Sequence, residues 1–167
     1  MRLILSGLTL LAAGCLPSYE EGRDLTFKES QAYFRDHSAN LLHIIDLVEA
    51  CRPAFPSEGV YNAIRLHDPT GNNPTCVNGG KPRIEEIISA MRNAQILVAD
   101  IRLSSQGQTD SASFALYSAG LSVSGVGVDL IYYADPRDIP QPPFEKGYEF
   151  KSLAVEPDNW FWRRWAT

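Results

Sequence analysis

Apolar residues recur at helical spacing over the first long segment of the chain, residues 26–51. A helix of about 3.6 residues per turn brings such positions onto one face, and the residues concerned are Phe27, Phe34, Leu41, Leu42, Ile45 and Val48. The segment opens on Thr26-Phe27-Lys28-Glu29, a capping-box pattern in which threonine and glutamate satisfy each other's backbone N–H groups. Pro53 ends the pattern, so we expect a helix from Thr26 to about Cys51.

A second helix is predicted after residue 81. Pro82 suits the first turn of a helix, where its missing N–H leaves no bond unmade. The next apolar residues repeat the helical spacing and are Ile84, Ile87, Ile88 and Met91. Before this helix, residues 60–66 alternate as a strand does, and residues 67–81 predict a long loop because they are rich in Asp, Pro, Gly and Asn.

The rest of the chain alternates between apolar and polar positions, which is typical of strands. The predicted strands are 97–103, 114–123, 126–133, 148–155 and 160–165, although a continued helix stays open for 97–103. Turns are expected over 104–111, at Ser124-Gly125 and at 156–159, and residues 135–147 predict an irregular connection because they carry four prolines. These elements predict an α+β fold, with two main helices packed on an antiparallel sheet of about five strands.

The first fourteen residues have the pattern of an export signal and not of a folded element. Arg2 supplies one positive charge, and an apolar run of about eleven residues follows, which is too short to span a bilayer. The segment Leu11-Ala12-Ala13-Gly14-Cys15 resembles the lipobox of bacterial lipoproteins, in which small residues precede the lipid-bearing cysteine. An ordinary secretory cleavage and a plain N-terminal helix remain the alternatives.

The lipobox resemblance implies how and where the protein is anchored. Residues 1–14 would be removed, and Cys15 would carry a diacylglyceryl group and an amide-linked acyl chain, which together anchor stably. Leu16 follows the cysteine, where the retention signal of enterobacterial inner-membrane lipoproteins is an aspartate. We therefore expect a lipid-anchored protein of the outer membrane, facing the periplasm, with residues 15–25 as a tether and residues 26–167 as a single domain.

Charge narrows the range of partners. Without Arg2 the 15 basic residues fall to 14, against 20 acidic residues. This acidic balance argues against a nucleic-acid partner and against an anionic-lipid surface. It is compatible with a cationic partner protein.

Two cysteines remain once Cys15 is lipidated. An even pair in an oxidising compartment predicts a disulfide, here between Cys51 and Cys76. Two buried free thiols are one alternative, and a metal pair is another. The sequence favours no metal site, because it has no C-x-x-C spacing and its three histidines do not follow a ligand pattern.

A search for catalytic motifs indicates no enzyme class and no cofactor. The chain lacks G-x-S-x-G, H-E-x-x-H and S-x-x-K arrangements. Residues 76–81 superficially resemble a phosphate loop, but Thr75 replaces its first glycine and no Ser or Thr follows Lys81. A paired-carboxylate hydrolase of the cell wall or of lipid stays open, because no spacing in sequence reveals two acids set across a cleft.

The C-terminal segment 159–165 holds all three tryptophans, interleaved with arginines. In a strand, Trp160, Trp162 and Arg164 share one face, and Phe161, Arg163 and Trp165 share the other. In the hairpin that we expect, Trp165 lies opposite Phe150. We expect the second face to pack on the domain core, because Phe161 and Trp165 make it the larger apolar strip. Trp160, Trp162 and Arg164 would then form an exposed site for a partner protein; plain core packing of the rings is the alternative.

The sequence thus predicts a non-catalytic envelope lipoprotein that binds another protein. Inhibitors, immunity factors and accessory subunits of envelope machines all belong to this class. A structural or assembly lipoprotein of the outer membrane is the second hypothesis. A hydrolase acting on the cell wall or on lipid is the third.

Overall fold

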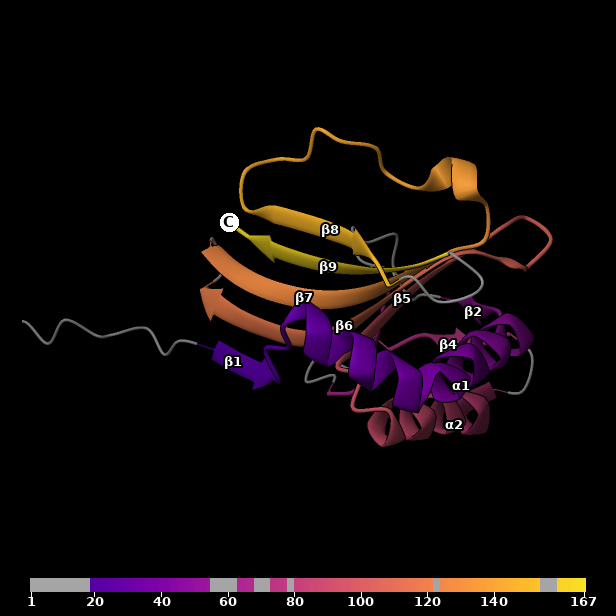
Figure 1. Cartoon of the computed structure of the whole chain (residues 1–167). Helices are drawn as coiled ribbons and strands as arrows, with labels where there is room; N and C mark the ends of the chain where they lie inside the picture. The colour runs from indigo at the N-terminus through magenta and orange to yellow at the C-terminus, as the bar shows by residue number, and fades with distance from the viewer. Residues whose placement is uncertain (1–18, 55–62, 68–72, 78–79, 122–123, 154–158) are drawn as a thin grey trace, which may run out of the picture.

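Figure 1 shows the computed structural model of the chain. The structure describes residues 19–54, 63–67, 73–77, 80–121, 124–153 and 159–167. The predicted signal segment 1–14 and the predicted lipid attachment site Cys15 lie outside these ranges, as do parts of the predicted strand 60–66 and of the turn 156–159. Neither of the described helices is long and apolar enough to cross a membrane.

The two predicted helices are confirmed. Helix α1 spans Phe27–Cys51, and helix α2 spans Gly80–Asn93. Both halves of the capping box are present at Thr26 and Glu29, and α1 ends where Arg52 turns into the left-handed region at φ 49°. The buried stripe of α1 differs from the predicted one in part. Leu42 is 46% exposed, whereas Ile44 and Leu47 are buried, because the stripe follows Leu41 and each step along a helix turns by about 100°.

The sheet confirms the α+β class and has more strands than the five or so expected. Six antiparallel strands lie in the order β3-β5-β6-β7-β9-β8, and β1 pairs with β6 beside this row. Their bounds are Tyr19–Gly22 (β1), Ala63–Arg65 (β3), Val98–Leu103 (β5), Thr109–Leu121 (β6), Ser124–Tyr133 (β7), Tyr148–Ser152 (β8) and Trp160–Ala166 (β9). A separate small sheet pairs β2, Pro53–Ala54, with β4, Thr75–Cys76. Of the predicted strand 97–103, residues 98–103 form β5, and the segment is not a continued helix.

Strand β1 corrects the predicted tether of residues 15–25. It pairs antiparallel with the second half of β6, with Gly22 opposite Tyr117 and Tyr19 opposite Gly120. Strand β6 is 13 residues long, and β5 covers its edge only from Thr109 to Ala115. The remaining edge carries free backbone N–H and C=O groups, which β1 satisfies.

Three predicted turns also differ from the structure. Strand β6 begins at Thr109, so the turn expected over 104–111 ends at residue 108. Leu121 pairs with Ser124 and Gly120 with Gly125, so Ser124 and Gly125 are paired residues of β7 and not the predicted turn. In the last hairpin Trp165 pairs with Tyr148 and Arg163 with Phe150, two residues away from the expected register that places Trp165 opposite Phe150. The irregular connection over 135–147 is confirmed apart from a short 3-10 helix, η1, at Pro136–Asp138.

Both helices lie side by side against one face of the sheet, which we call the inner face (Figure 1). The core between them is built from alternate residues of the strands and from the stripes of α1 and α2, including Leu41, Ile44, Val48, Ile87, Met91, Ala99, Phe114 and Leu130. The intervening residues point to the opposite, outer face. In Figure 1 the chain from η1 arcs past β8 at the far edge of the sheet.

The predicted disulfide is confirmed. It joins Cys51, the last residue of α1, to Cys76 in β4. The chain around it is held by backbone bonds, since Val77 N–H donates to Arg52 C=O at 3.3 Å. The Arg52 guanidinium reaches the β5–β6 turn and donates to Gln106 C=O at 3.0 Å. The bridge therefore connects the helical layer to the otherwise irregular segment before α2.

Candidate binding surface

The expectation that Trp160 and Trp162 form an exposed site is wrong. Each is only 3% exposed, and both belong to the core cluster on the inner face. The ring of Trp160 packs on Phe34 of α1, with centroids 4.9 Å apart. The ring of Trp162 meets Phe27 of α1 edge to face at 5.6 Å. The two indoles are therefore the contact between the C-terminal strand and the first helix.

The grouping of residues on β9 was nevertheless right, and only the choice of face was reversed. The register differs from the predicted one by two residues, which leaves the same side chains on each face. The face of β9 with the larger apolar strip is not the one that packs on the core. The other face packs there, because α1 places Phe27 against Trp162 and Phe34 against Trp160.

Arg164 lies at the margin of the inner face. It pairs with Asp24 in the connection between β1 and α1, at 3.3 Å, and its side chain is 36% exposed. This contact ties the C-terminal strand to the start of the domain. Trp160, Trp162 and Arg164 thus do not form the predicted surface site.

The outer face of the same strand carries a buried ion pair. Asp129 of β7 lies directly opposite Arg163 of β9. One carboxylate oxygen of Asp129, Oδ2, accepts from Arg163 Nε at 2.8 Å and from Arg163 Nη2 at 2.5 Å. The same oxygen accepts from Trp165 Nε1 at 3.1 Å. Arg163 Nη2 also lies 3.4 Å from Ser113 Oγ on β6, so three strands are joined around one carboxylate.

A glycine makes room for this arrangement. Gly127 lies opposite Trp165 in the register of β7 and β9. A Cβ at Gly127 would sit 2.4 Å from Trp165 Cζ2, well inside van der Waals contact. Because glycine has no side chain, the indole can lie over the backbone of β7 with its N–H directed at Asp129.

Burial and charge oppose each other at this site. Desolvation raises the pKa of Asp129, while the charge of Arg163 and the hydrogen bonds from Arg163 and Trp165 lower it, with burial the larger effect. Asp100 on β5 behaves alike: burial raises its pKa, and the charges of Arg102 and Arg163 oppose the shift. The charge of Arg163 therefore lowers the pKa of two carboxylates on the outer face, those of Asp129 and Asp100.

Beside the ion pair lies a group of rings that we call the aromatic cluster. Its members are Tyr133, Phe144, Tyr148, Phe150 and Phe161. Phe150 stacks on Phe161 at 4.9 Å, and Phe144 of the irregular connection packs on Phe150 at 5.5 Å. Phe161 is buried, whereas the other four rings are only partly buried. Arg163 lies over the ring of Tyr148 at 6.0 Å, which joins the cluster to the ion pair.

Sequence reasoning missed Asp129, although a signal was present. Asp129 is the single charged residue in β7, whose sequence is otherwise apolar or small apart from Ser124 and two tyrosines. An acid in such a strand needs a partner when it is buried. Arg163, alternating with the two core tryptophans on a neighbouring strand, was available as that partner.

The comparisons with known proteins give no family. No protein-family model, no curated protein and no solved structure matches the chain. Within the described ranges, no group of three or more His, Cys, Asp or Glu side chains is arranged to hold a metal ion.

Proposed function

We propose that this protein is a non-catalytic lipoprotein of the bacterial outer membrane whose periplasmic domain binds another protein. The classes that fit are an inhibitor or immunity factor and an accessory subunit of an envelope machine. The proposed binding surface is the outer face of the β8–β9 hairpin, in place of the inner face that the sequence suggested.

The proposed address rests on the N-terminal sequence and on the disulfide. Ala12-Ala13-Gly14-Cys15 has the lipobox pattern, and Leu16 is not the aspartate associated with inner-membrane retention. The disulfide between Cys51 and Cys76 supports export, because such bonds persist in oxidising compartments and are rare in the cytosol.

The observation that carries the proposed binding role is the fixed placement of Arg163 and Trp165 on the outer face. Both donate to Asp129, so neither is free to change rotamer without losing a buried hydrogen bond. Both remain only partly buried, as do Tyr148 and Phe150 across the hairpin. Tyr, Trp, Phe and Arg are the residues enriched at the centres of protein interfaces. A surface that is already ordered loses little entropy when a partner binds.

The same contacts favour binding over catalysis at this site. The exposed fraction of Asp129 is 7%, and its Oδ2 already accepts three hydrogen bonds from Arg163 and Trp165. A carboxylate used in this way organises its neighbours and is poorly placed to accept a proton from a substrate. The charge of Arg163 is offset by Asp129, so the surface suits a partner that offers apolar groups and a few hydrogen-bond acceptors.

Site-specific photo-crosslinking in the native envelope tests the proposal. A benzophenone amino acid placed at Tyr148 keeps an aromatic ring on the outer face, and the same residue placed at Arg35 marks an exposed position on α1. We expect one discrete crosslinked protein from position 148 and none from position 35. Equal products from both positions, or none from position 148, would contradict the proposed surface.

The affinity for the partner identified in this way should depend on the outer face. Phe150→Ala removes a partly buried ring without touching the Asp129 bonds, and it is expected to weaken binding by about tenfold or more. Leu42→Ala, at an exposed position of α1, serves as the matched control and should leave binding unchanged.

A further inference from the structure

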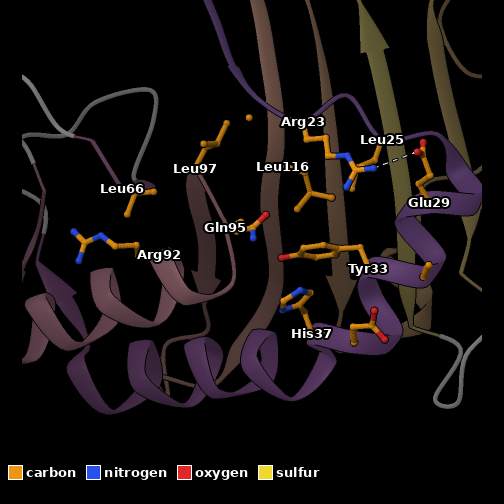
Figure 2. A pocket seen from close by; sticks show the side chains of 13 residues that line it. Arg23, Leu25, Glu29, Tyr33, His37, Leu66, Arg92, Gln95, Leu97 and Leu116 are labelled. Atoms are coloured by element: carbon orange, nitrogen blue, oxygen red, sulfur yellow. Dashed lines mark hydrogen bonds and ion pairs between the residues drawn. The ribbon is translucent and has the colours of Figure 1, made fainter.

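A cavity of about 650 Å3 lies on the other side of the molecule, between the first half of α1, the end of α2 and the connection from β1 to α1 (Figure 2). Its volume is in the range of small-molecule sites. It shares no residue with the outer face of the β8–β9 hairpin, so its role is independent of partner binding there.

One side of the cavity is apolar. It is formed by four leucines from separate segments of the chain, Leu25, Leu66, Leu97 and Leu116. Leu25 and Leu116 are buried, and the other two are partly buried. In Figure 2 the side chain of Leu116 points toward the ring of Tyr33.

The ring of Tyr33 is fixed in place. His37, one turn further along α1, stacks on it with centroids 4.4 Å apart. Its hydroxyl donates to the carbonyl of Ala94 at the end of α2. Burial raises the pKa of Tyr33, so the phenol stays neutral. Figure 2 shows the ring between His37 on one side and Leu116 and Arg23 on the other. The cavity therefore has a rigid aromatic wall facing leucines.

Two arginines line the cavity, and Figure 2 shows them at opposite ends of it, Arg92 near Leu66 and Arg23 near Glu29. Arg92, in the last turn of α2, is exposed and makes no hydrogen bond or ion pair with any residue of the described ranges. The Arg23 side chain is 76% exposed, and among the described residues it forms an ion pair with Glu29 alone, at 3.5 Å. Glu29 already accepts a hydrogen bond from Thr26 in the capping box. The other acid that lines the cavity, Asp36, is exposed. Arg92 is thus the cation most available to a ligand.

The entrance is shaped by Gly22, the last residue of β1. Its φ is +88°, and a Cβ there would lie 2.1 Å from the carbonyl oxygen of Leu116 and 2.9 Å from Leu97 Cδ1. The backbone can pass this close to the floor of the cavity only because residue 22 is glycine. The next residue, Arg23, is fixed by its N–H bond to Leu116 C=O at 3.2 Å. The chain that leads from the proposed lipid anchor therefore forms the rim of the cavity.

We propose that this cavity binds a single-chain amphiphile with an anionic head group, of which a free fatty acid is the simplest example. The hydrocarbon chain lies against the leucines and the face of Tyr33, where burial of apolar surface is favourable. The head group is bound by Arg92, at the end of the cavity near Leu66, because a guanidinium donates paired N–H bonds to a carboxylate or a phosphate. The position of the rim supports this occupant, since only residues 16–18 separate Cys15 from β1.

The test uses the full-length protein in phosphatidylcholine vesicles, with a diazirine-bearing fatty acid as the probe. After irradiation, the labelled peptides are identified by mass spectrometry. We expect labels in peptides containing residues 22–37 and 92–97. The corresponding fatty alcohol, which lacks the anionic head, should label these peptides about tenfold less. A third sample carries the diazirine on the chains of phosphatidylglycerol, without free fatty acid, and should label the peptides weakly.

Two variants and one control complete the test. Ala32→Trp fills the cavity from an exposed position of α1 and should abolish labelling, with a melting curve confirming that the variant is folded. Arg92→Gln should weaken saturation by the fatty acid about tenfold. Arg83→Gln, on the same helix but paired with Glu86 and outside the cavity, should change nothing.

Three outcomes would overturn the proposal. Labelling that persists in folded Ala32→Trp would place the ligand elsewhere. Equal labelling by the acid and the alcohol would remove the role of Arg92. Labelling by phosphatidylglycerol as strong as by the free fatty acid would mean contact with the bilayer surface instead of a bound amphiphile. None of these results depends on whether the outer face of the hairpin binds a protein.

Discussion

Arg163 and Asp129 occupy directly opposed positions on β9 and β7, and the guanidinium holds one carboxylate oxygen through both Nε and Nη2, at 2.8 and 2.5 Å. The indole of Trp165 donates to that same oxygen. A single buried acid therefore sets the positions of an arginine and a tryptophan on the outer face. The aromatic cluster and this ion pair form one continuous, ordered surface, because Arg163 also lies over Tyr148.

The first prediction concerns the pH dependence of stability at Asp129. Burial raises the pKa of Asp129 in the folded state above the value of about 3.9 expected in the unfolded chain. The folded state then binds this proton more tightly, so the free energy of unfolding falls as pH rises above about 4, until the folded pKa is passed. Urea unfolding of the wild type and of Asp129→Asn, from acid to neutral pH, isolates this contribution. The wild type should lose stability relative to the variant as pH rises; a relative gain would mean that Arg163 and Trp165 outweigh burial.

The second prediction concerns the loss of Arg163. Arg163→Met keeps the aliphatic length but leaves Asp129 buried without its cation, which should lower the free energy of unfolding by about 3 kcal/mol. The value is at the lower end of the usual range because the Arg163 side chain is 28% exposed. Arg163→Met combined with Asp129→Leu should recover much of the loss, since no unpaired charge remains. Equal losses in the single and double variants would show that the packing of Arg163 matters and its charge does not.

The third prediction follows from the burial of the indoles. Trp160→Ala or Trp162→Ala should lower the free energy of unfolding by about 3 to 5 kcal/mol, as for other large core residues. Trp162→Phe should cost much less, because the indole N–H of Trp162 has no hydrogen-bond partner in the described part of the chain. Arg164→Ala removes only a half-exposed pair with Asp24 and should cost about 1 kcal/mol or less. Chemical unfolding ranks the variants; a small loss in Trp162→Ala would contradict its core position.

The helices and most strands were predictable because they depend on local pattern. The capping box at Thr26 fixed the start of α1, and the alternation along 97–103 and 160–165 identified β5 and β9. Even the division of β9 into two faces was right, because alternation survives a shift of register by two residues.

Local sequence pattern does not show which of the two apolar faces of β9 is buried. It also does not show which distant segments of the chain contact each other. Trp160 and Trp162 are buried because α1 brings Phe34 and Phe27 to them, a contact that spans most of the chain. Strand β1 forms because β6 extends several residues beyond the part that pairs with β5. Predicting it would require the lengths of both strands. Asp129 is the single acid of β7, but only the pairing of β7 with β9 identifies Arg163 as its partner.

The fourth prediction is that the Cys51–Cys76 bridge contributes to stability. Its ends are 25 residues apart in sequence, and closing such a loop in the unfolded chain removes entropy worth about 3 to 4 kcal/mol. Cys51→Ala with Cys76→Ala should lower the free energy of unfolding by about this amount. Mass spectrometry of the exported protein, alkylated after unfolding but before reduction, checks the bridge itself. Alkylation of both cysteines without reductant would show that it does not form in the cell.

The fifth prediction is that Cys15→Ser releases the protein from the membrane while the domain stays folded. The motivation is the Ala12-Ala13-Gly14-Cys15 pattern, since serine offers no thiol for the lipid. A stable anchor needs two or more acyl chains, which the resemblance to the lipobox implies for Cys15 alone. The domain should keep its fold because β1, the nearest described element, pairs with β6 from Tyr19 onward and does not involve Cys15.

Detergent-phase partitioning of cells that express each form provides the measurement for Cys15→Ser. The wild type should enter the detergent phase, and the serine variant should stay in the aqueous phase with an unchanged melting temperature. Leu16→Asp is the matched control for the address: it retains the cysteine, so the protein should remain lipidated and move from the outer to the inner membrane. A serine variant that still partitions into detergent would refute lipid anchoring. A Leu16→Asp variant that stays in the outer membrane would refute only the sorting assignment, because anchoring and sorting depend on different residues.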